Sequence, residues 1–112
     1  MAINSPVDGA YHLAATSTST TIAISGANQQ THRYHVVNGG AQEVFLVLSR
    51  SSGITAAFPA AGAKAKGYVI AANSEAYVDG PICGEGNTVY AAAIAPTGTT
   101  DLYITPVARS NE

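Results

Sequence analysis

Short stretches rich in valine, isoleucine, threonine and tyrosine recur about every ten residues, and glycine, proline, asparagine or serine separates them. These residue types favour an extended backbone. No window shows the apolar spacing and N-terminal cap of an amphipathic helix. The pattern therefore predicts an all-β fold, an antiparallel β-sandwich or a jelly-roll-like small barrel of about seven to eight strands.

The turn signals predict how successive strands are joined. Asn38-Gly39 tolerates positive φ and predicts a tight hairpin, with Gly39 in that conformation. A second turn is expected at 72–74, and a third at 96–99, where Gly98 supplies the left-handed position. Gly80-Pro81 and Pro106 are expected to end their strands. The strands themselves are expected at 19–25, 31–37, 43–49, 67–71, 75–79, 87–95 and 100–105.

Alternation along the strands predicts which side chains are buried. Tyr34 and Val36 should share one face, and Arg33 and His35 the other. The apolar run 44–48 lacks alternation, so it should be a central strand buried on both faces. These positions are expected to supply much of the core.

The chain has room for one domain. We expect an extended N-terminal arm over 1–18, a β-sandwich domain over 19–106 and a C-terminal tail over 107–112. Residues 51–67 hold few large apolar side chains and include a stretch rich in alanine and glycine. This segment is expected to be a long, exposed and mobile loop.

Charged residues make up 11% of the chain, against about 25% in an ordinary soluble domain. Low charge with abundant small residues favours a surface that rests against other protein, although hydroxyls and amides could instead serve hydration. The net charge is −2 and the five basic residues are scattered, which argues against nucleic-acid binding. No secretory signal or membrane-spanning apolar run is present in the sequence.

The sequence offers no recognisable catalytic centre. His32 and His35 are three residues apart and should face opposite sides of a strand, and His12 has no accompanying ligand pattern. Cys83 is the single cysteine and has no basic neighbour in sequence to activate it. The acidic loop 79–87 lacks the alternation of a calcium loop. We therefore expect a protein that is not an enzyme, with no cofactor and no metal.

Alanine and tyrosine are the residues that point to a binding role. Small side chains at Ala91, Ala92, Ala93 and Ala95 would let another sheet or a neighbouring subunit approach closely. Tyrosines within strands either pack in the core or form an aromatic face for a protein or a sugar. The residues expected to bind a partner are Tyr11, His12, Tyr90, Tyr103 and Arg109.

Two segments resemble small bacteriophage virion proteins. Residues 89–106 (VYAAAIAPTGTTDLYITP) are similar to the closing hairpin of that group, and residues 34–48 (YHVVNGGAQEVFLVL) resemble an earlier hairpin. The resemblance covers about a third of the chain and implies a β-sandwich or jelly-roll protein that sits on a phage head or at its tail junction. The ending VARSNE differs from the glycine-rich acidic tail of the group.

These observations lead to two alternative functions. The first is a capsid decoration (cement) protein that bridges neighbouring capsid subunits on the virion surface and is assembled in the host cytoplasm. Its partners would be the major capsid protein or another virion protein, and copies of itself in a dimer or trimer. The alternative is a carbohydrate- or receptor-binding β-sandwich module of a phage tail or fibre, using residues such as Tyr11 and 28–30.

Overall fold

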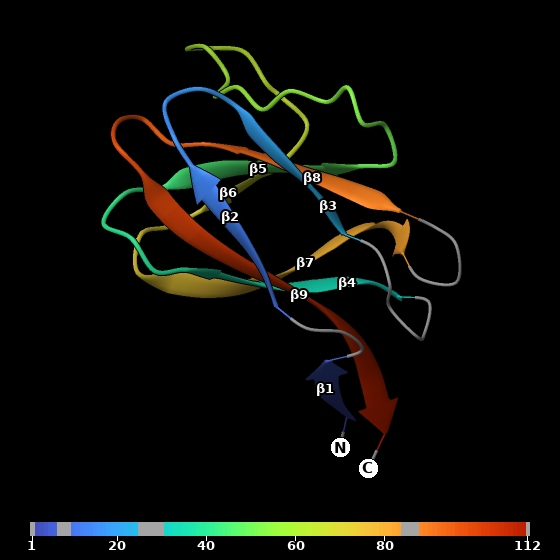
Figure 1. Ribbon diagram of the computed structural model, residues 1–112. Coiled ribbons are helices and arrows are strands. Elements are labelled where there is room, and N and C mark those ends of the chain that lie inside the picture. The colour runs from blue at the N-terminus through green and yellow to red at the C-terminus, as the bar shows by residue number, and fades with distance from the viewer. Residues whose placement is uncertain (1, 7–9, 25–30, 84–87, 112) are drawn as a thin grey trace.

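The computed structural model describes residues 2–6, 10–24, 31–83 and 88–111, and all regular structure in these residues is β-strand (Figure 1). The strands form two antiparallel sheets that pack face to face, which confirms the predicted all-β sandwich. The strands are β1 (Ala2–Pro6), β2 (Tyr11–Ala15), β3 (Thr20–Ile24), β4 (Thr31–Asn38), β5 (Val44–Ser49), β6 (Tyr68–Ile70), β7 (Ser74–Cys83), β8 (Val89–Ile94) and β9 (Thr100–Asn111).

Sheet A contains β9 in its middle, with β4 and then β7 on one side. On the other side, β9 pairs with β2 through residues 100–104 and with β1 through residues 107–111. Sheet B has the order β3-β8-β5-β6. Edge strand β7 of sheet A therefore lies on the same side of the sandwich as edge strand β6 of sheet B.

The main core fills the space between the sheets. Tyr34 and Val36 of β4 are fully buried, whereas Arg33 and His35 lie on the outer face, as the alternation predicted. In β5, the first three residues, 44–46, are buried, and the strand pairs with β8 and β6 on its two sides. The prediction of a central strand at 44–48 is thus confirmed.

The alanines of β8 are covered within the chain itself. Ala91 and Ala93 face sheet A in the main core, while Ala92 faces outward and packs with Phe45. The segment 54–58 crosses this outer face of sheet B, where Phe58 lies 6.0 Å from Phe45 between ring centroids. Small side chains therefore allow close approach on both faces of β8, and residues 51–67 form a loop whose first part packs on sheet B.

The predicted Asn38-Gly39 hairpin is wrong. β4 belongs to sheet A and β5 to sheet B, so the connection crosses the sandwich. Gly39 does not adopt the positive φ that was predicted for it. The asparagine acts through its side chain, whose oxygen accepts a hydrogen bond from Gly40 N at 2.9 Å. Its amide nitrogen donates to the carbonyls of Gln42 (2.8 Å) and Ile70 (3.2 Å), the latter in sheet B.

The other two predicted hairpins also cross between the sheets. β6 lies in sheet B and β7 in sheet A, and the same is true of β8 and β9. Gly98 has φ of 63°, which confirms the predicted left-handed position. Asn73, within the predicted turn 72–74, is also left-handed, with φ of 51°, although no backbone conformation was predicted for it. The position of both turns was therefore predicted correctly, but the strand pairing was not.

Neither proline ends its strand. β7 continues through Pro81 to Cys83, and β9 continues through Pro106 to Asn111. Pro81 lies on an edge strand, where a missing N–H costs little. Pro106 lies between the part of β9 that pairs with β2 and the part that pairs with β1, so on that edge of β9 no described strand is paired with Pro106. A proline is tolerated there because no ladder hydrogen bond on that edge needs its N–H.

The segments expected to be an arm and a tail both contain strands. Within 1–18, β2 is part of sheet A, and its Leu13 and Ala15 are buried in the main core. β1 and the end of β9 instead form a ribbon with five paired positions, from Ala2 with Asn111 to Pro6 with Val107. Among the described residues the ribbon is two-stranded from 108 to 111, because β4 also pairs with β9 at Val107. Figure 1 shows this ribbon (dark blue and dark red) projecting away from the body of the sandwich, with both marked chain ends at its tip.

Candidate partner-binding surface

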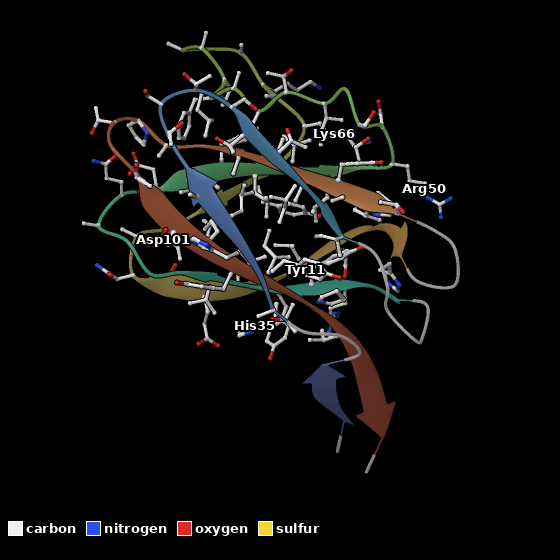
Figure 2. The ribbon with its side chains drawn as sticks, viewed as in Figure 1. Tyr11, His35, Arg50, Lys66 and Asp101 are labelled. Carbon is white, nitrogen blue, oxygen red and sulfur yellow. The ribbon has the colours of Figure 1, made fainter. Side chains whose placement is uncertain are left out.

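The outer face of sheet A carries the two most exposed tyrosines of the described residues, together with several ionisable side chains. Alternation along β2, β9, β4 and β7 directs residues such as His12, Tyr103, His35 and Tyr77 away from the core. Tyr77 is 50% exposed and Tyr103 is 43% exposed. Figure 2 shows His35 on the side of sheet A that faces away from sheet B.

One group on this face joins β2 to β9. The His12 ring stacks on Tyr103, with centroids 5.1 Å apart and planes 21° apart. His12 Nε2 also lies 2.8 Å from Asp101 Oδ1. Register explains the contact, because His12 is directly opposite Tyr103 and Asp101 is two residues earlier on the same face of β9.

A second group of the same composition joins β4 to β7. The His35 ring lies 4.8 Å from the Tyr77 ring, directly opposite it in the ladder, and His35 Nε2 lies 3.2 Å from Glu75 Oε1. In both groups, therefore, a histidine contacts a tyrosine across the strands and a carboxylate. In the next row, Arg33 Nε approaches Asp79 Oδ1 at 3.7 Å.

This arrangement suits contact with another protein better than it suits chemistry. Exposed contacts between a histidine and a carboxylate contribute only about 0–1 kcal/mol each to folding, so these groups add little to stability. Tyrosine combines a large apolar ring with a polar hydroxyl and is enriched in protein interfaces. The face presents two such rings, Tyr77 and Tyr103, each held in place by a histidine.

Of the four predicted binding residues whose side chains the structure describes, two lie together. His12 and Tyr103 stack on the outer face of sheet A, whereas Tyr11 packs against the main core. Tyr90 is half-buried and alternates with the core-facing Ala91, so it lies on the outer face of sheet B. Arg109 lies in β9 opposite Asn4, and its side chain is outside the described residues.

Sequence reasoning did not single out His35 and Tyr77 as a pair. The sequence alternation was enough to place both side chains on an outward face, but the contact between them depends on the register between β4 and β7. Among the described residues, no three His, Cys, Asp or Glu side chains come together as a metal site. The predicted loop at 84–87, the side chain of Cys83 and the segment 28–30 lie outside the described residues.

Comparison with family models, curated proteins and solved structures gives no match for this chain. Among the described residues there is also no helix long and apolar enough to cross a membrane.

Proposed function

We propose that this chain is a non-enzymatic structural protein of a bacteriophage virion that decorates the capsid and bridges neighbouring capsid subunits. The observation that carries the proposal is the β1/β9 ribbon. It projects from a compact sandwich (Figure 1), and within the described residues β1 pairs with no strand except β9.

An isolated two-stranded ribbon is at best marginally stable in water, because a third strand or a packed layer is needed to cover it. Docking against another protein would supply that layer. An open strand edge can also pair directly with a strand of a neighbour, in which case main-chain hydrogen bonds provide the affinity. The ribbon therefore supports attachment to a larger assembly, with the major capsid protein or another virion protein as its partner on the virion surface.

The outer face of sheet A supports the same role. A protein that binds many equivalent sites on a shell requires contact area and no reaction, and two exposed tyrosines offer such area. A second contact surface, distinct from the ribbon, would allow one copy to touch two neighbours or to associate with further copies in a dimer or trimer. Binding only to the assembled shell stabilises the shell by mass action.

The test uses empty heads of the phage that encodes the chain, with and without the purified protein. We expect heads that lack the protein to disrupt at a lower temperature, and added protein to restore them. Deletion of 2–6 removes β1 alone and should abolish binding to heads, while the free protein still melts cooperatively. Deletion of 1–18 is unsuitable, because it also removes core residues Leu13 and Ala15.

Tyr103→Ala provides a second variant, and Val69→Ala a matched control for loss of an exposed apolar side chain outside sheet A. Tyr103→Ala should weaken binding to heads, whereas Val69→Ala should not. If the full-length protein leaves the melting temperature of the heads unchanged, the proposed function is wrong.

A further inference from the structure

Asn38-Gly39 is the one place in the sequence where an asparagine precedes a glycine, and it lies where the chain crosses from sheet A to sheet B. Asparagine is a heat-labile residue, because the main-chain nitrogen of the next residue can attack its side-chain amide. A glycine in the next position has no Cβ atom to hinder that attack. The dipeptide is therefore chemically reactive, and the fold decides whether it reacts.

The reaction needs only water and base. Gly39 N gives up its proton to base and bonds to Asn38 Cγ. The bond from Cγ to the side-chain nitrogen breaks, and that nitrogen takes up a proton and leaves as ammonia. The product is a cyclic succinimide. Water then opens the ring at either carbonyl carbon, which leaves aspartate or isoaspartate at this position.

The folded chain holds both reacting groups apart. Gly39 N donates a hydrogen bond to the main-chain oxygen of Asp101 at 3.1 Å, so its hydrogen points to β9. The side-chain amide of Asn38 is held at its oxygen by Gly40 N and at its nitrogen by two main-chain carbonyls. The residue is also 1% exposed, so base and water do not reach it.

These contacts cannot be released by movement of the turn alone. Asn38 is the last residue of β4 and is paired on both sides, with Leu102 of β9 and with Ser74 of β7. Its amide nitrogen also reaches the carbonyl of Ile70 in sheet B. Freeing this side chain therefore breaks contacts to strands of both sheets, which amounts to an opening close to global unfolding.

We propose that Asn38 is a spontaneous deamidation site that is closed in the folded protein and open in the unfolded chain, and that reaction there prevents refolding. Aspartate at this position keeps the acceptor for Gly40 N but lacks both donors. Isoaspartate routes the main chain through the former side chain and lengthens the connection between the sheets. Time spent unfolded thus becomes permanent loss of folded protein. The proposal does not depend on the capsid role.

The experiment compares the full chain in mildly alkaline buffer with the same chain in urea that unfolds it. Peptide mass spectrometry measures deamidation at Asn38 over time. Because refolding is fast compared with deamidation, the rate in buffer should match the rate in urea multiplied by the unfolded fraction. For a domain of ordinary stability, the rate in buffer should be at least about a thousandfold lower.

Two core variants test the dependence on unfolding. Leu46→Ala and the milder Ile104→Val raise the unfolded fraction and leave every hydrogen-bond partner of Asn38 in place. Each should speed deamidation in buffer by the factor by which urea unfolding shows that fraction to rise, with no change of the rate in urea. The control Val69→Ala, at an exposed side chain, should change neither rate.

Gly39→Ala separates the chemistry from the fold. Its Cβ atom would lie 4.0 Å from the main-chain oxygen of Asp101, an ordinary contact, and the position has no positive φ, so the folded state is kept. The added methyl group hinders the attacking nitrogen. Deamidation in urea should therefore slow severalfold, and more of this variant than of the unchanged protein should refold after long incubation in urea.

The proposal is overturned by any of three results. The first is deamidation of Asn38 at equal rates in buffer and in urea. The second is a rate in buffer that the core variants leave unchanged. The third is a deamidated chain that refolds as completely as fresh protein.

Discussion

The buried amide of Asn38 offers the sharpest test of how the two sheets are joined. The residue is 1% exposed and makes three hydrogen bonds, with Gln42, Gly40 and Ile70. At about 0.5–1.5 kcal/mol for each bond, Asn38→Ala should lower the free energy of unfolding by about 2–4 kcal/mol. Total stability for such domains is about 5–15 kcal/mol, so the loss is a large share.

Asn38→Asp makes the test more specific. It keeps the acceptor for Gly40 N but loses both donors, and it places a carboxylate beside the carbonyls of Gln42 and Ile70. A buried charge with Gly40 N as its one remaining donor costs more than loss of the hydrogen bonds alone, so Asn38→Asp should be less stable at pH 7 than Asn38→Ala. Urea unfolding followed by circular dichroism measures both values.

The matched control is Gln42→Ala. Gln42 is also an amide with two side-chain hydrogen bonds, to Thr97 Oγ1 (2.7 Å) and from Thr97 N (3.0 Å), but these are exposed to solvent. Water can replace them, so the loss should stay below about 1 kcal/mol. In thermal melts, Asn38→Ala should lower Tm by about 8–16 °C. A loss below about 1 kcal/mol for Asn38→Ala would refute the inference that this side chain links the sheets.

Three further changes test the core, a turn and a hydroxyl. Leu46 is fully buried, so Leu46→Ala should lower the free energy of unfolding by about 2–5 kcal/mol in urea, whereas Val69→Ala, at a side chain that is 62% exposed, should change it by less than about 0.5 kcal/mol. Similar losses for the two variants would contradict the register of β5. Gly98→Ala should lower the free energy of unfolding by about 1 kcal/mol because of the left-handed φ at this position, while Gly39→Ala should be nearly neutral. Equal losses of stability in the same assay would contradict the assigned backbone conformations. Tyr34→Phe removes a hydrogen bond to the main chain of β7 and should lower the free energy of unfolding, measured by chemical denaturation, by about 1–2 kcal/mol. An unchanged denaturation midpoint would show that this bond contributes nothing to stability.

The fold class and the buried faces could be predicted because they depend on local pattern. Alternation correctly separated Tyr34 and Val36 from Arg33 and His35, and the apolar run in β5 correctly indicated a strand with neighbours on both sides. Alternation describes one strand at a time, however. It does not say which strand is the neighbour, and a short turn can close a hairpin or cross to the opposite sheet.

Asn38 illustrates why the pairing was missed. An Asn-Gly pair favours a hairpin when the backbone adopts positive φ, but here the asparagine side chain forms the turn contact with Gly40 and reaches across to Ile70. The candidate surface was missed in part for a related reason. His12 and Asp101 are 89 residues apart in sequence, and only the pairing of β2 with β9 brings them within 2.8 Å.

The position of β9 in the middle of sheet A has a consequence for how the protein is made. β9 pairs with β1, β2 and β4, and the ribosome synthesises all three before it. Until β9 emerges, β2 has no partner among the described strands of sheet A, and one edge of β4 has no neighbouring strand. Sheet A therefore cannot finish folding before β9 has been synthesised, and contacts this distant in sequence place refolding in the range of about milliseconds to seconds. During synthesis, the unfinished chain exposes strand edges that a chaperone would have to protect.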